Sequence, residues 1–337
     1  MPENKAVVMH EPGLENLNWE NQALVSPGPN DIALRMSAFS INWRDLATIS
    51  GRIPHTKMPL IPLSDGVGEV VECGANVSRF KPGDRVCPMF FPRWVSGKPE
   101  SGVYEHALGG TEDGVLRQYM TLSENAASKV PAHLSDQQAA SLPCAALTAW
   151  TALTSEGGVT AGDTVLLQGT GGVSIFGLQF AKLMGANTII TSSDDAKLEK
   201  AKALGADEVI NYKTTPEWGA AVKKLTGGRG ADRVLDVGGP ATIAESVNAI
   251  AQNGRILIIG VLGGRAAELT LPLLMVKHVT LEAITVGHRA SFEAMCRAMD
   301  LHETQPIVDS TYKADELGKA LQAMATGEHF GKIALTL

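Results

Sequence analysis

The chain has 337 residues, of which 44% are hydrophobic and 19% are charged, and this composition excludes disordered and fibrous proteins. A domain usually holds about 100–200 residues, so the length predicts two domains. Acidic residues outnumber basic ones by 36 to 29, and the net charge of −7 argues against a dedicated nucleic-acid-binding protein.

The cysteines lie far apart and form no C-x-x-C pair, so neither a disulfide framework nor a thiolate metal cage is expected. They are Cys73, Cys87, Cys144 and Cys296. The polar N-terminus runs into a strand-like segment and does not resemble a signal peptide. No apolar run approaches the roughly 20 residues that cross a bilayer, so no membrane partner is expected. These features predict reduced thiols and a cytoplasmic location.

About the first 130 residues carry short apolar runs separated by turns rich in Pro and Gly. The predicted strands are Ala6–Met9, Asp31–Ala38, Gly68–Cys73 and Asp84–Pro88. Pro27-Gly28-Pro29 and Lys81-Pro82-Gly83-Asp84 are predicted turns. This pattern predicts an antiparallel, barrel-like domain.

The pattern changes near Ala132, where strands and amphipathic helices begin to alternate. The predicted strands are Thr164–Gln168, Thr188–Thr191, Glu208–Ile210, Arg233–Asp236, Arg255–Gly260 and Val279–Val286. Apolar strands separated by helices predict a parallel sheet that is covered on both faces.

A glycine-rich turn directly follows the strand Thr164–Gln168 and directly precedes a predicted helix. It reads Gly169-Thr170-Gly171-Gly172-Val173-Ser174. Small residues let the backbone approach a pyrophosphate, and the helix N-terminus offers free N–H groups and a positive dipole end. Ser174 stands where the G-x-G-x-x-G pattern has its last glycine. An ordinary tight turn explains one or two glycines but not this run, so we expect a dinucleotide site.

The tip of the second strand indicates which coenzyme binds. An NAD site has an acidic residue at that tip. Here the tip carries the hydroxyls Ser192 and Ser193, and the acids Asp194 and Asp195 come later, where they are expected to cap the next helix. Hydroxyls leave room for a 2′-phosphate that Lys197 would neutralise, although Lys197 also fits a solvated surface lysine. The sequence therefore favours NADPH over NADH.

At this point the sequence resembles the medium-chain dehydrogenase/reductase superfamily, and within it the zinc-free quinone oxidoreductase-like branch, over nearly the whole chain. The resemblance rests on ordered segments besides the glycine-rich turn: Ser40–Leu46, Ser64–Val70, Phe80–Val86, Leu142–Trp150 and Phe330–Lys332. It implies an α/β fold with an N-terminal chaperonin-10-like β-barrel and a Rossmann doubly wound parallel sheet. The expected domains are 1–130 with 288–337, and 131–287, because the C-terminal tail returns to the barrel.

The same resemblance identifies the positions of this chain that match the zinc ligands of relatives. Their Cys, His and Cys ligands, and the Glu beside the His, match Asn42, Ser64, Cys144 and Asp65. Only Cys144 keeps a ligand type, and one thiolate with one carboxylate makes a weak site. The segment matching the structural-zinc lobe, Phe90–Gly110, contains no cysteine. We therefore expect no zinc, and Cys144 is expected to be a buried cysteine rather than a reactive thiol.

Without zinc, hydrogen bonds must polarise the substrate carbonyl. The resemblance places four catalytic candidates at the cleft: Asn42, Ser64, Asp65 and Thr148. Asn42 is the candidate donor to the substrate oxygen, or else a turn-capping residue. Asp65 is a candidate proton relay, and Thr148 is either close to the nicotinamide or an ordinary helix threonine. Asp45 is expected to be structural, pairing with Arg44 or capping a helix.

Further coenzyme-binding candidates follow from the resemblance. Tyr212 matches a tyrosine that flanks the adenosine phosphate in NADPH-using relatives, or else it is a packed loop residue. Gly238 and Gly260 follow the fourth and fifth strands, where the backbone passes the coenzyme. Lys332, in the Phe-Gly-Lys segment, is also expected to contact the coenzyme. The aromatic loop Phe90–Gly110 shapes the substrate pocket or forms core.

The expected reaction is hydride transfer from NADPH to a quinone, an enone or a related conjugated carbonyl. Two alternatives stay open: an alcohol dehydrogenase or aldehyde reductase with the same coenzyme, and a nucleotide-binding sensor with little turnover. The resemblance also implies a homodimer joined through the predicted strand Val279–Val286. The natural substrate, a small molecule, is not defined by the sequence.

Overall fold

Two compact units make up the chain, and the computed structural model describes residues 4–337. The first unit runs to residue 147 and resumes at residue 286, and the second spans residues 148–285. The first boundary therefore falls later than residue 130, where the change of sequence pattern places it. The reason is that α2 (Asp136–Ala140) packs against β3 (Asp31–Ser40) and β4 (Asp65–Cys73) of the first unit.

The first unit is built on a seven-stranded sheet with the order β14-β15-β3-β4-β5-β7, in which β6 also pairs with β3. Its other strands are β1 (Asn4–Met9), β2 (Leu17–Gln22), β5 (Arg85–Pro88), β6 (Tyr119–Ser123), β7 (Ala127–Lys129), β14 (Val308–Lys313) and β15 (Lys332–Thr336). β1 and β2 form a separate antiparallel pair. The helices are α1 (Trp43–Ile49), α2, the π-helical turn η4 (Leu142–Ala146), α9 (Arg289–His302) and α10 (Leu317–Thr326). Short 3-10 turns are η1 (Leu14–Asn16), η2 (Val103–Glu105), η3 (Glu124–Ala126) and η6 (Ala314–Glu316).

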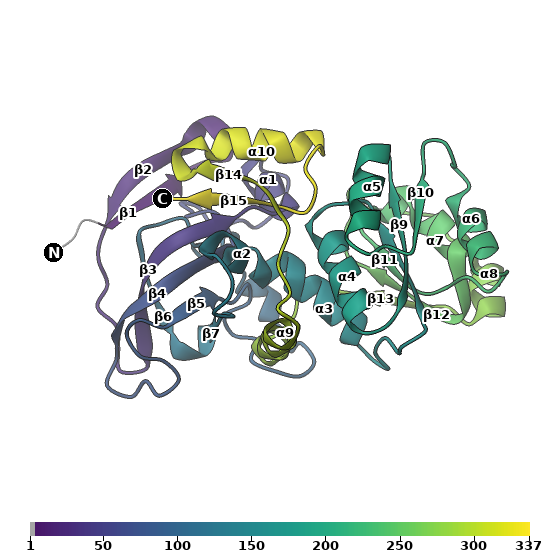
Figure 1. Cartoon of the computed structure of the whole chain (residues 1–337). Coiled ribbons are helices and arrows are strands. Elements are labelled where there is room, and N and C mark those ends of the chain that lie inside the picture. The colour runs from purple at the N-terminus through teal and green to yellow at the C-terminus, as the bar shows by residue number, and fades with distance from the viewer. Residues whose placement is uncertain (1–3) are drawn as a thin grey trace. The chain divides into compact units, whose positions relative to one another are not determined.

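The C-terminal tail completes this sheet, as the resemblance implies. β15 pairs antiparallel with β3, with Ala334 opposite Ser40, and β14 pairs parallel with β15. Figure 1 shows the yellow C-terminal strands beside the purple β3. Phe39 and Leu335, which face each other in this register, are both fully buried in the core of the unit. The tail therefore contributes both sheet and core to the first unit.

The second unit is a six-stranded sheet with the order β10-β9-β8-β11-β12-β13, and every neighbouring pair is parallel. The strands are β8 (Thr164–Gln168), β9 (Asn187–Ser192), β10 (Glu208–Asn211), β11 (Ala231–Asp236), β12 (Ile250–Ile258) and β13 (Thr280–Ala283). The helices are α3 (Leu147–Thr154), which begins at the boundary, α4 (Gly172–Leu183), α5 (Asp195–Ala203), α6 (Trp218–Leu225), α7 (Ile243–Ala249) and α8 (Leu271–Lys277), with the 3-10 turn η5 (Gly239–Ala241). This is the strand order of a doubly wound nucleotide-binding sheet.

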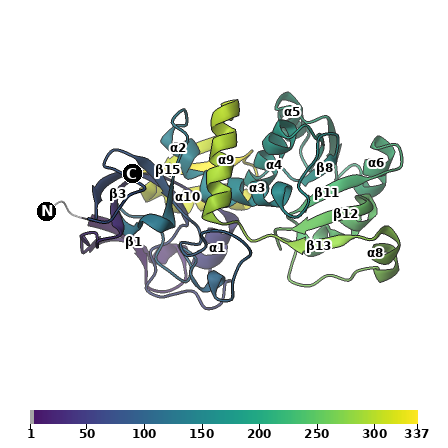
Figure 2. The same ribbon diagram turned by 90° about the horizontal axis from the view of Figure 1, so that it is seen from below.

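Helices cover both faces of the parallel sheet, which explains its continuous apolar strands. α4 and α5 pack on β8, β9 and β10, and α7 packs on β11 and β12 (Figures 1 and 2). All five residues of β8 are buried. The buried strand β8 therefore leads directly into the glycine-rich turn at its carboxyl end.

The strand predictions are confirmed in position but differ in extent. The expected strand Val279–Val286 is shorter, because β13 ends at Ala283 and Val286 has a left-handed backbone with φ of 58°. The expected Arg255–Gly260 begins earlier, at Ile250. The strands β2, β6 and β7 were not predicted from the sequence. β2 is half-exposed and polar, so its sequence carries little hydrophobic periodicity.

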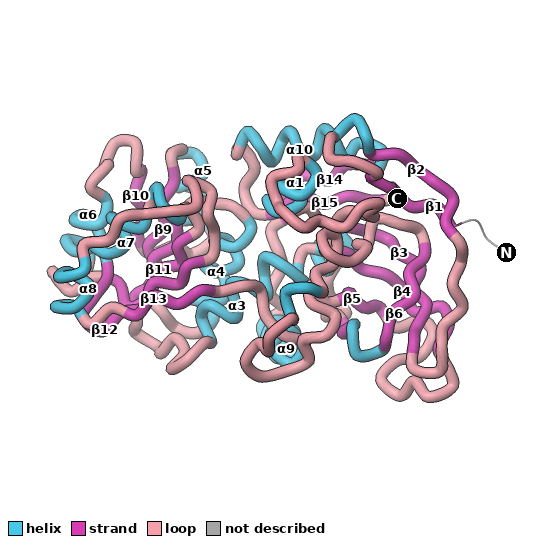
Figure 3. The backbone as a smooth tube through the Cα atoms, turned by 180° about the vertical axis from the view of Figure 1, so that it is seen from behind, coloured by secondary structure: helices cyan, strands magenta, loops and turns pink. Residues whose placement is uncertain are grey.

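Among residues 4–337, no helix is long and apolar enough to cross a membrane. The chain between β5 and β6 is mostly loop (Figure 3). Its aromatic residues Phe90, Phe91 and Trp94 are buried, while Tyr104 is 49% exposed. Phe91 packs edge-on against Tyr104 with ring centroids 5.4 Å apart. This loop therefore has an aromatic core of its own.

Candidate active site

Four segments of the first unit bring three of the predicted catalytic side chains together with Cys144 and Lys332. Asn42 is the N-cap residue of α1, and Ser64 directly precedes Asp65, the first residue of β4. Cys144 lies in η4, and Lys332 begins β15. Asn42 is 9% exposed, Lys332 is 4% exposed, and Ser64 and Asp65 are fully buried. A buried polar group is costly unless it is hydrogen-bonded, so the contacts of each side chain define the site.

Asp65 lies at the centre of these contacts. Its Oδ1 accepts a hydrogen bond from Ser64 Oγ at 2.7 Å, and its Oδ2 accepts one from the Cys144 backbone N–H at 3.2 Å. Burial raises the pKa of Asp65 above its ordinary value, and the Lys332 ammonium is the largest opposing influence. The Asp65 carboxylate is therefore held by a hydroxyl, a peptide N–H and a neighbouring positive charge.

The ammonium of Lys332 contacts Asn42 directly. Lys332 Nζ donates to Asn42 Oδ1 at 2.6 Å and to the Ile41 carbonyl at 2.7 Å. A hydrogen-bonding contact from the Asn42 side chain also lowers the pKa of Asp65, so Nδ2 lies beside that carboxyl. Among residues 4–337, Nδ2 nevertheless has no acceptor at normal hydrogen-bond geometry. The site thus contains a buried amide donor that no protein acceptor satisfies at normal geometry.

The structure confirms the structural role expected for Asp45. Its Oδ2 accepts a hydrogen bond from the Asn42 backbone N–H at 2.8 Å, and its Oδ1 lies 3.3 Å from Arg44 Nη1. Arg44 also donates to the Leu108 and Gly109 carbonyls. Burial raises the pKa of Asp45 from 3.8 to about 6, although Arg44 opposes the shift. Asp45 therefore fixes the start of α1 and, through it, the backbone of Asn42.

The glycine-rich turn in the second unit has the geometry of an anion cradle. Gly169 has φ of 72°, a conformation that glycine adopts without strain. A Cβ added at Gly169 or Gly171 would meet no atom within 4 Å, so space lies in front of both residues. Gly171 is the N-cap of the 12-residue helix α4 and supplies no capping side chain. The N–H groups of the first helical turn, from Gly172 and Val173 onward, therefore need an outside acceptor.

Ser174, which departs from the glycine pattern, fastens this turn. Its Oγ donates to the Gln168 carbonyl at 2.6 Å, and its side chain is buried. The hydroxyl thus joins the first turn of α4 to the end of β8. Thr170 is also buried in this turn. The serine keeps the close helix–strand contact that the third glycine would allow.

The predicted residues for the adenosine end of the coenzyme meet at the carboxyl ends of β9 and β10. The Tyr212 N–H donates to the Ser192 carbonyl at 3.0 Å. Ser193 follows on the same turn, and Lys197 lies in the first turn of α5. Tyr212 is 41% exposed, which does not fit a packed loop tyrosine.

Both acids of this turn are engaged by the protein. Asp194 Oδ1 caps α5 by accepting from the Ala196 and Lys197 N–H groups, as expected. Asp195 Oδ1 accepts from Asn211 Nδ2 at 2.6 Å. Each carboxylate is thus held through one of its two oxygens.

Sequence reasoning missed a buried network at the end of β11. Asp236 is fully buried, and its Oδ1 accepts from the Gly239 N–H at 2.8 Å and from Thr242 Oγ1 at 2.6 Å. Its Oδ2 accepts from Ser246 Oγ at 2.6 Å and from Gln168 Nε2 at 3.2 Å. The sequence signal that could have indicated this network is an acidic residue at the end of an apolar strand. The network ties the end of β8 to the turn that follows β11.

The structure gives Gly238 and Gly260 a packing role within their own unit. A Cβ at Gly238 would lie 2.5 Å from the Thr242 side chain, and one at Gly260 would lie 2.1 Å from the Val237 carbonyl oxygen. Both glycines are thus required by the crowded turns after β11 and β12. This requirement holds whether or not a coenzyme passes them.

Two predicted residues belong to a different unit from the other members of the groups to which they were assigned. Thr148 is buried on α3 and belongs to the second unit rather than to the unit of Asn42. Lys332 was expected to contact the coenzyme, but it belongs to the first unit and bonds to Asn42. The other predicted coenzyme residues all belong to the second unit.

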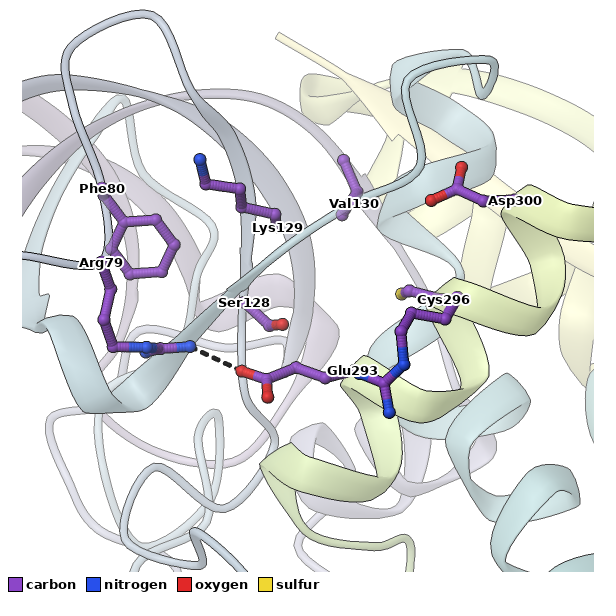
Figure 4. A pocket seen from close by; sticks show the side chains of 9 residues that line it. Arg79, Phe80, Ser128, Lys129, Val130, Glu293, Cys296 and Asp300 are labelled. Carbon is purple, nitrogen blue, oxygen red and sulfur yellow. Dashed lines mark hydrogen bonds and ion pairs between the residues drawn. The ribbon is translucent and has the colours of Figure 1, made fainter.

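Two surface cavities lie away from the predicted residues. The cavity in the first unit, of about 300 Å³, is lined by charged side chains that include Arg79 and Glu293, which form an ion pair at 2.6 Å (Figure 4). The cavity in the second unit, of about 350 Å³, is lined by Lys223, Arg229 and Lys277 among others. Neither contains a residue assigned to substrate or coenzyme.

Comparisons with known proteins agree with this geometry. Residues 28–132 match the family described as alcohol dehydrogenase GroES-like domain, and residues 172–300 match the family described as zinc-binding dehydrogenase. A zinc-type alcohol dehydrogenase-like protein of Schizosaccharomyces pombe is 38% identical over 316 residues, covering 92% of this chain and 91% of that protein. A chloroplast envelope quinone oxidoreductase homolog of Arabidopsis thaliana is 30% identical over 334 residues, covering 95% and 94%.

A solved structure is similar over its full length. A Sinorhizobium meliloti 1021 protein, provisionally described as an alcohol dehydrogenase, is 39% identical with a TM-score of 0.94 and 100% coverage of both chains. The chain therefore belongs to the medium-chain dehydrogenase/reductase superfamily of NAD(P)-dependent oxidoreductases. Its two units are the GroES-like domain and the Rossmann domain of that fold.

The side chains present do not fit the zinc named in one family description. Catalytic zinc takes three protein ligands from Cys, His and carboxylate groups, and a thiol must lose its proton to coordinate. Burial raises the pKa of the Cys144 thiol far above its ordinary value, and the Asp65 carboxylate is already hydrogen-bonded. The Lys332 ammonium adds a positive charge beside the remaining oxygen, Asn42 Oδ1. Residues 4–337 contain no group of three His, Cys, Asp or Glu residues that would hold a metal ion.

Proposed function

We propose that this protein is an NADPH-dependent, zinc-independent oxidoreductase that reduces a quinone, an enone or a related conjugated carbonyl. The observation that carries the proposal is the buried Asn42 amide, whose Oδ1 is bound by Lys332 and whose Nδ2 has no acceptor at normal hydrogen-bond geometry among residues 4–337. A buried donor without an acceptor costs about 1–3 kcal/mol. A substrate oxygen that accepts from Nδ2 would remove this cost.

The coenzyme would be held by the second unit. The pyrophosphate would lie on the open glycine cradle from Gly169 to Val173, where the helix dipole and free N–H groups favour an anion. Ser192, Ser193, Lys197 and Tyr212 would surround the 2′-phosphate. When bound, the reduced nicotinamide supplies the hydride. The serine that ends β9, and the use of the next acid, Asp194, as the cap of α5, support NADPH over NADH.

The first unit would polarise the substrate. Asn42 Nδ2 donates to the carbonyl oxygen, where negative charge develops as hydride arrives. Asp65, held by Ser64 and Cys144, keeps the charge of the site balanced against Lys332, and the Ser64 hydroxyl bonded to Asp65 is a candidate relay for the proton that completes the reduction. Thr148 would contact the nicotinamide from the second unit.

The side chains of this cluster do not fit a zinc ion, so the carbonyl would be polarised by hydrogen bonds alone, and this favours a conjugated substrate. In an enone or a quinone, hydride adds at a carbon remote from the oxygen, and conjugation spreads the developing charge. One amide donor and a nearby ammonium then suffice, whereas a simple aldehyde concentrates the charge on one oxygen. The quinone oxidoreductase homolog of Arabidopsis thaliana supports this substrate class.

We extend the proposal to assembly and location. A homodimer would form through residues 279–286, where β13 is an edge strand whose one partner among residues 4–337 is β12. No nucleic-acid or membrane partner is proposed. Cys87 and Cys296 are buried cysteines that form no disulfide, which supports a reducing compartment such as the cytoplasm.

Steady-state NADPH oxidation with a panel of quinones, enones, aldehydes and alcohols tests this function. The proposal expects the highest kcat/KM on a quinone or an enone. The names of several relatives favour the alternative of an alcohol or aldehyde oxidoreductase, for which simple alcohols or aldehydes would give the highest value. Saturable NADPH binding with no turnover on any class would identify a nucleotide sensor instead.

A further inference from the structure

Lys332 contacts the proposed substrate donor rather than any predicted coenzyme residue. Its Nζ bonds to Asn42 Oδ1 at 2.6 Å and to the Ile41 carbonyl at 2.7 Å, and its side chain is almost fully buried. The pairing of two strands places Lys332 beside these partners. Ala334 of β15 pairs with Ser40 of β3, and continuing that antiparallel register by two residues places Lys332 opposite Asn42.

The bond from Lys332 determines which end of the Asn42 carboxamide, Oδ1 or Nδ2, points toward the lysine. An ammonium has three donors and no acceptor, so it can bond only to the carboxamide oxygen. The opposite orientation of the amide would point the NH₂ group at a buried cation and would be strongly disfavoured. With Oδ1 bound, Nδ2 is the only end of the side chain that is left for another molecule.

The same ammonium provides the positive charge of the cluster. Asp45 and Asp65 are both completely buried, and Lys332 lowers the pKa of each of these carboxyls. A cation that withdraws electron density through Oδ1 also makes the amide N–H groups better donors, because hydrogen bonds in a chain polarise one another. Lys332 therefore acts on Asn42 both by orientation and by charge.

We propose that Lys332 is a positioning residue that fixes the Asn42 carboxamide with Nδ2 as the donor to a substrate oxygen. This inference rests on the proposed function and assigns Lys332 a task other than binding a coenzyme phosphate. The consequence is specific: loss of Lys332 weakens the transition state for hydride transfer while leaving coenzyme affinity unchanged.

The test compares Lys332→Met with the control Lys313→Met, an exposed lysine on the neighbouring strand β14. For Lys332→Met we expect kcat on the best quinone or enone to fall roughly 10- to 100-fold, with the NADPH dissociation constant within about twofold of the wild type. The control should change neither value. An NADPH dissociation constant that rises tenfold or more, with kcat retained at saturating NADPH, would overturn the proposal in favour of phosphate binding.

A double-mutant cycle distinguishes loss of positioning from loss of folded protein. Asn42→Asp keeps the acceptor for Lys332 and the shape of the side chain but removes the amide donor. Adding Lys332→Met to Asn42→Asp should lower kcat no further, because the group that Lys332 positions is already absent. Independent, multiplicative losses would contradict the positioning role.

A spectroscopic readout separates this inference from the proposed function. In protein with ¹⁵N-labelled asparagine, the Asn42 side-chain NH₂ signals should report one fixed orientation in the wild type and in Lys313→Met, and exchange between orientations in Lys332→Met. If the wild type reduces no substrate, the proposed function fails while these signals still decide the role of Lys332. Unchanged signals in Lys332→Met would overturn that role.

Discussion

Lys332 Nζ and Asn42 Oδ1 are separated by 290 positions in the sequence, yet they lie 2.6 Å apart. The pairing of β15 with β3 brings them together and joins the last strand of the chain to the start of α1. The C-terminal tail is therefore part of the candidate active site as well as of the sheet.

Gly171→Val tests the coenzyme cradle. The backbone of Gly171 has φ of −77°, and a Cβ there meets nothing within 4 Å, so the fold should tolerate the substitution. The added side chain would occupy the space in front of α4, and we expect the NADPH dissociation constant to rise at least about tenfold. Calorimetric titration measures this change. Gly318→Val, at another glycine with open space, is the control and should bind NADPH normally. Equal affinity in Gly171→Val would place the pyrophosphate elsewhere.

Lys197→Ala tests the choice between the two coenzymes. A lysine beside the 2′-phosphate interacts with NADPH and not with NADH. We expect the ratio of kcat/KM for NADPH to that for NADH to fall roughly tenfold, a loss of about 1.4 kcal/mol. Lys200→Ala, further along the same helix, should leave the ratio unchanged. A wild type that prefers NADH would refute the assignment before any variant is made.

Asp45→Asn tests the charge buried at the start of α1. Burial raises the pKa of Asp45 from 3.8 to about 6, so the folded state holds a proton between these values that the unfolded state has lost. The carboxyl therefore lowers the free energy of unfolding as pH rises from about 4 to about 6, by on the order of 2–3 kcal/mol in total. Denaturant unfolding across this range should show that the wild type loses stability relative to Asp45→Asn.

The control for this measurement is Asp315→Asn, at an exposed carboxyl of the same unit. It removes a carboxyl that is not buried and so reports what loss of a surface charge does to the unfolding free energy. A difference between the wild type and Asp45→Asn that stays constant from pH 4 to pH 6 would show that burial does not raise the pKa of Asp45.

Leu281→Asp tests the proposed dimer. Leu281 lies in β13, at the edge of the parallel sheet, and is half-buried within the chain. A charge there would oppose edge-to-edge pairing with a second copy. Sedimentation should give a mass near twice 35.6 kDa for the wild type and near 35.6 kDa for the variant. A monomeric wild type would exclude this interface under those conditions.

The residues that local patterning identifies are those that share a turn or a strand end. The glycine-rich turn, the hydroxyls after β9 and the caps of α5 are contiguous in the sequence, so strand–turn–helix patterning was enough to predict them. The resemblance to a family supplied Asn42, Ser64 and Asp65, which no local pattern would join.

The contacts that patterning could not predict depend on pairing register and on packing of distant segments. Lys332 was assigned to the coenzyme because its segment resembles the family, and no local pattern predicts its bond to Asn42, which depends on the register of β15 on β3. Asp236 was recognised only as the end of a strand, because its four donors come from three separate segments. Long-range hydrogen bonds of this kind leave no periodicity in the sequence.

The most direct test of the central claim is the rate of NADPH oxidation with a quinone or an enone, measured on protein that has been treated with a chelator and shown to be free of zinc. The account predicts that kcat is unchanged by chelation and is not increased when zinc is added. A kcat that disappears with the metal and returns with added zinc would contradict the account.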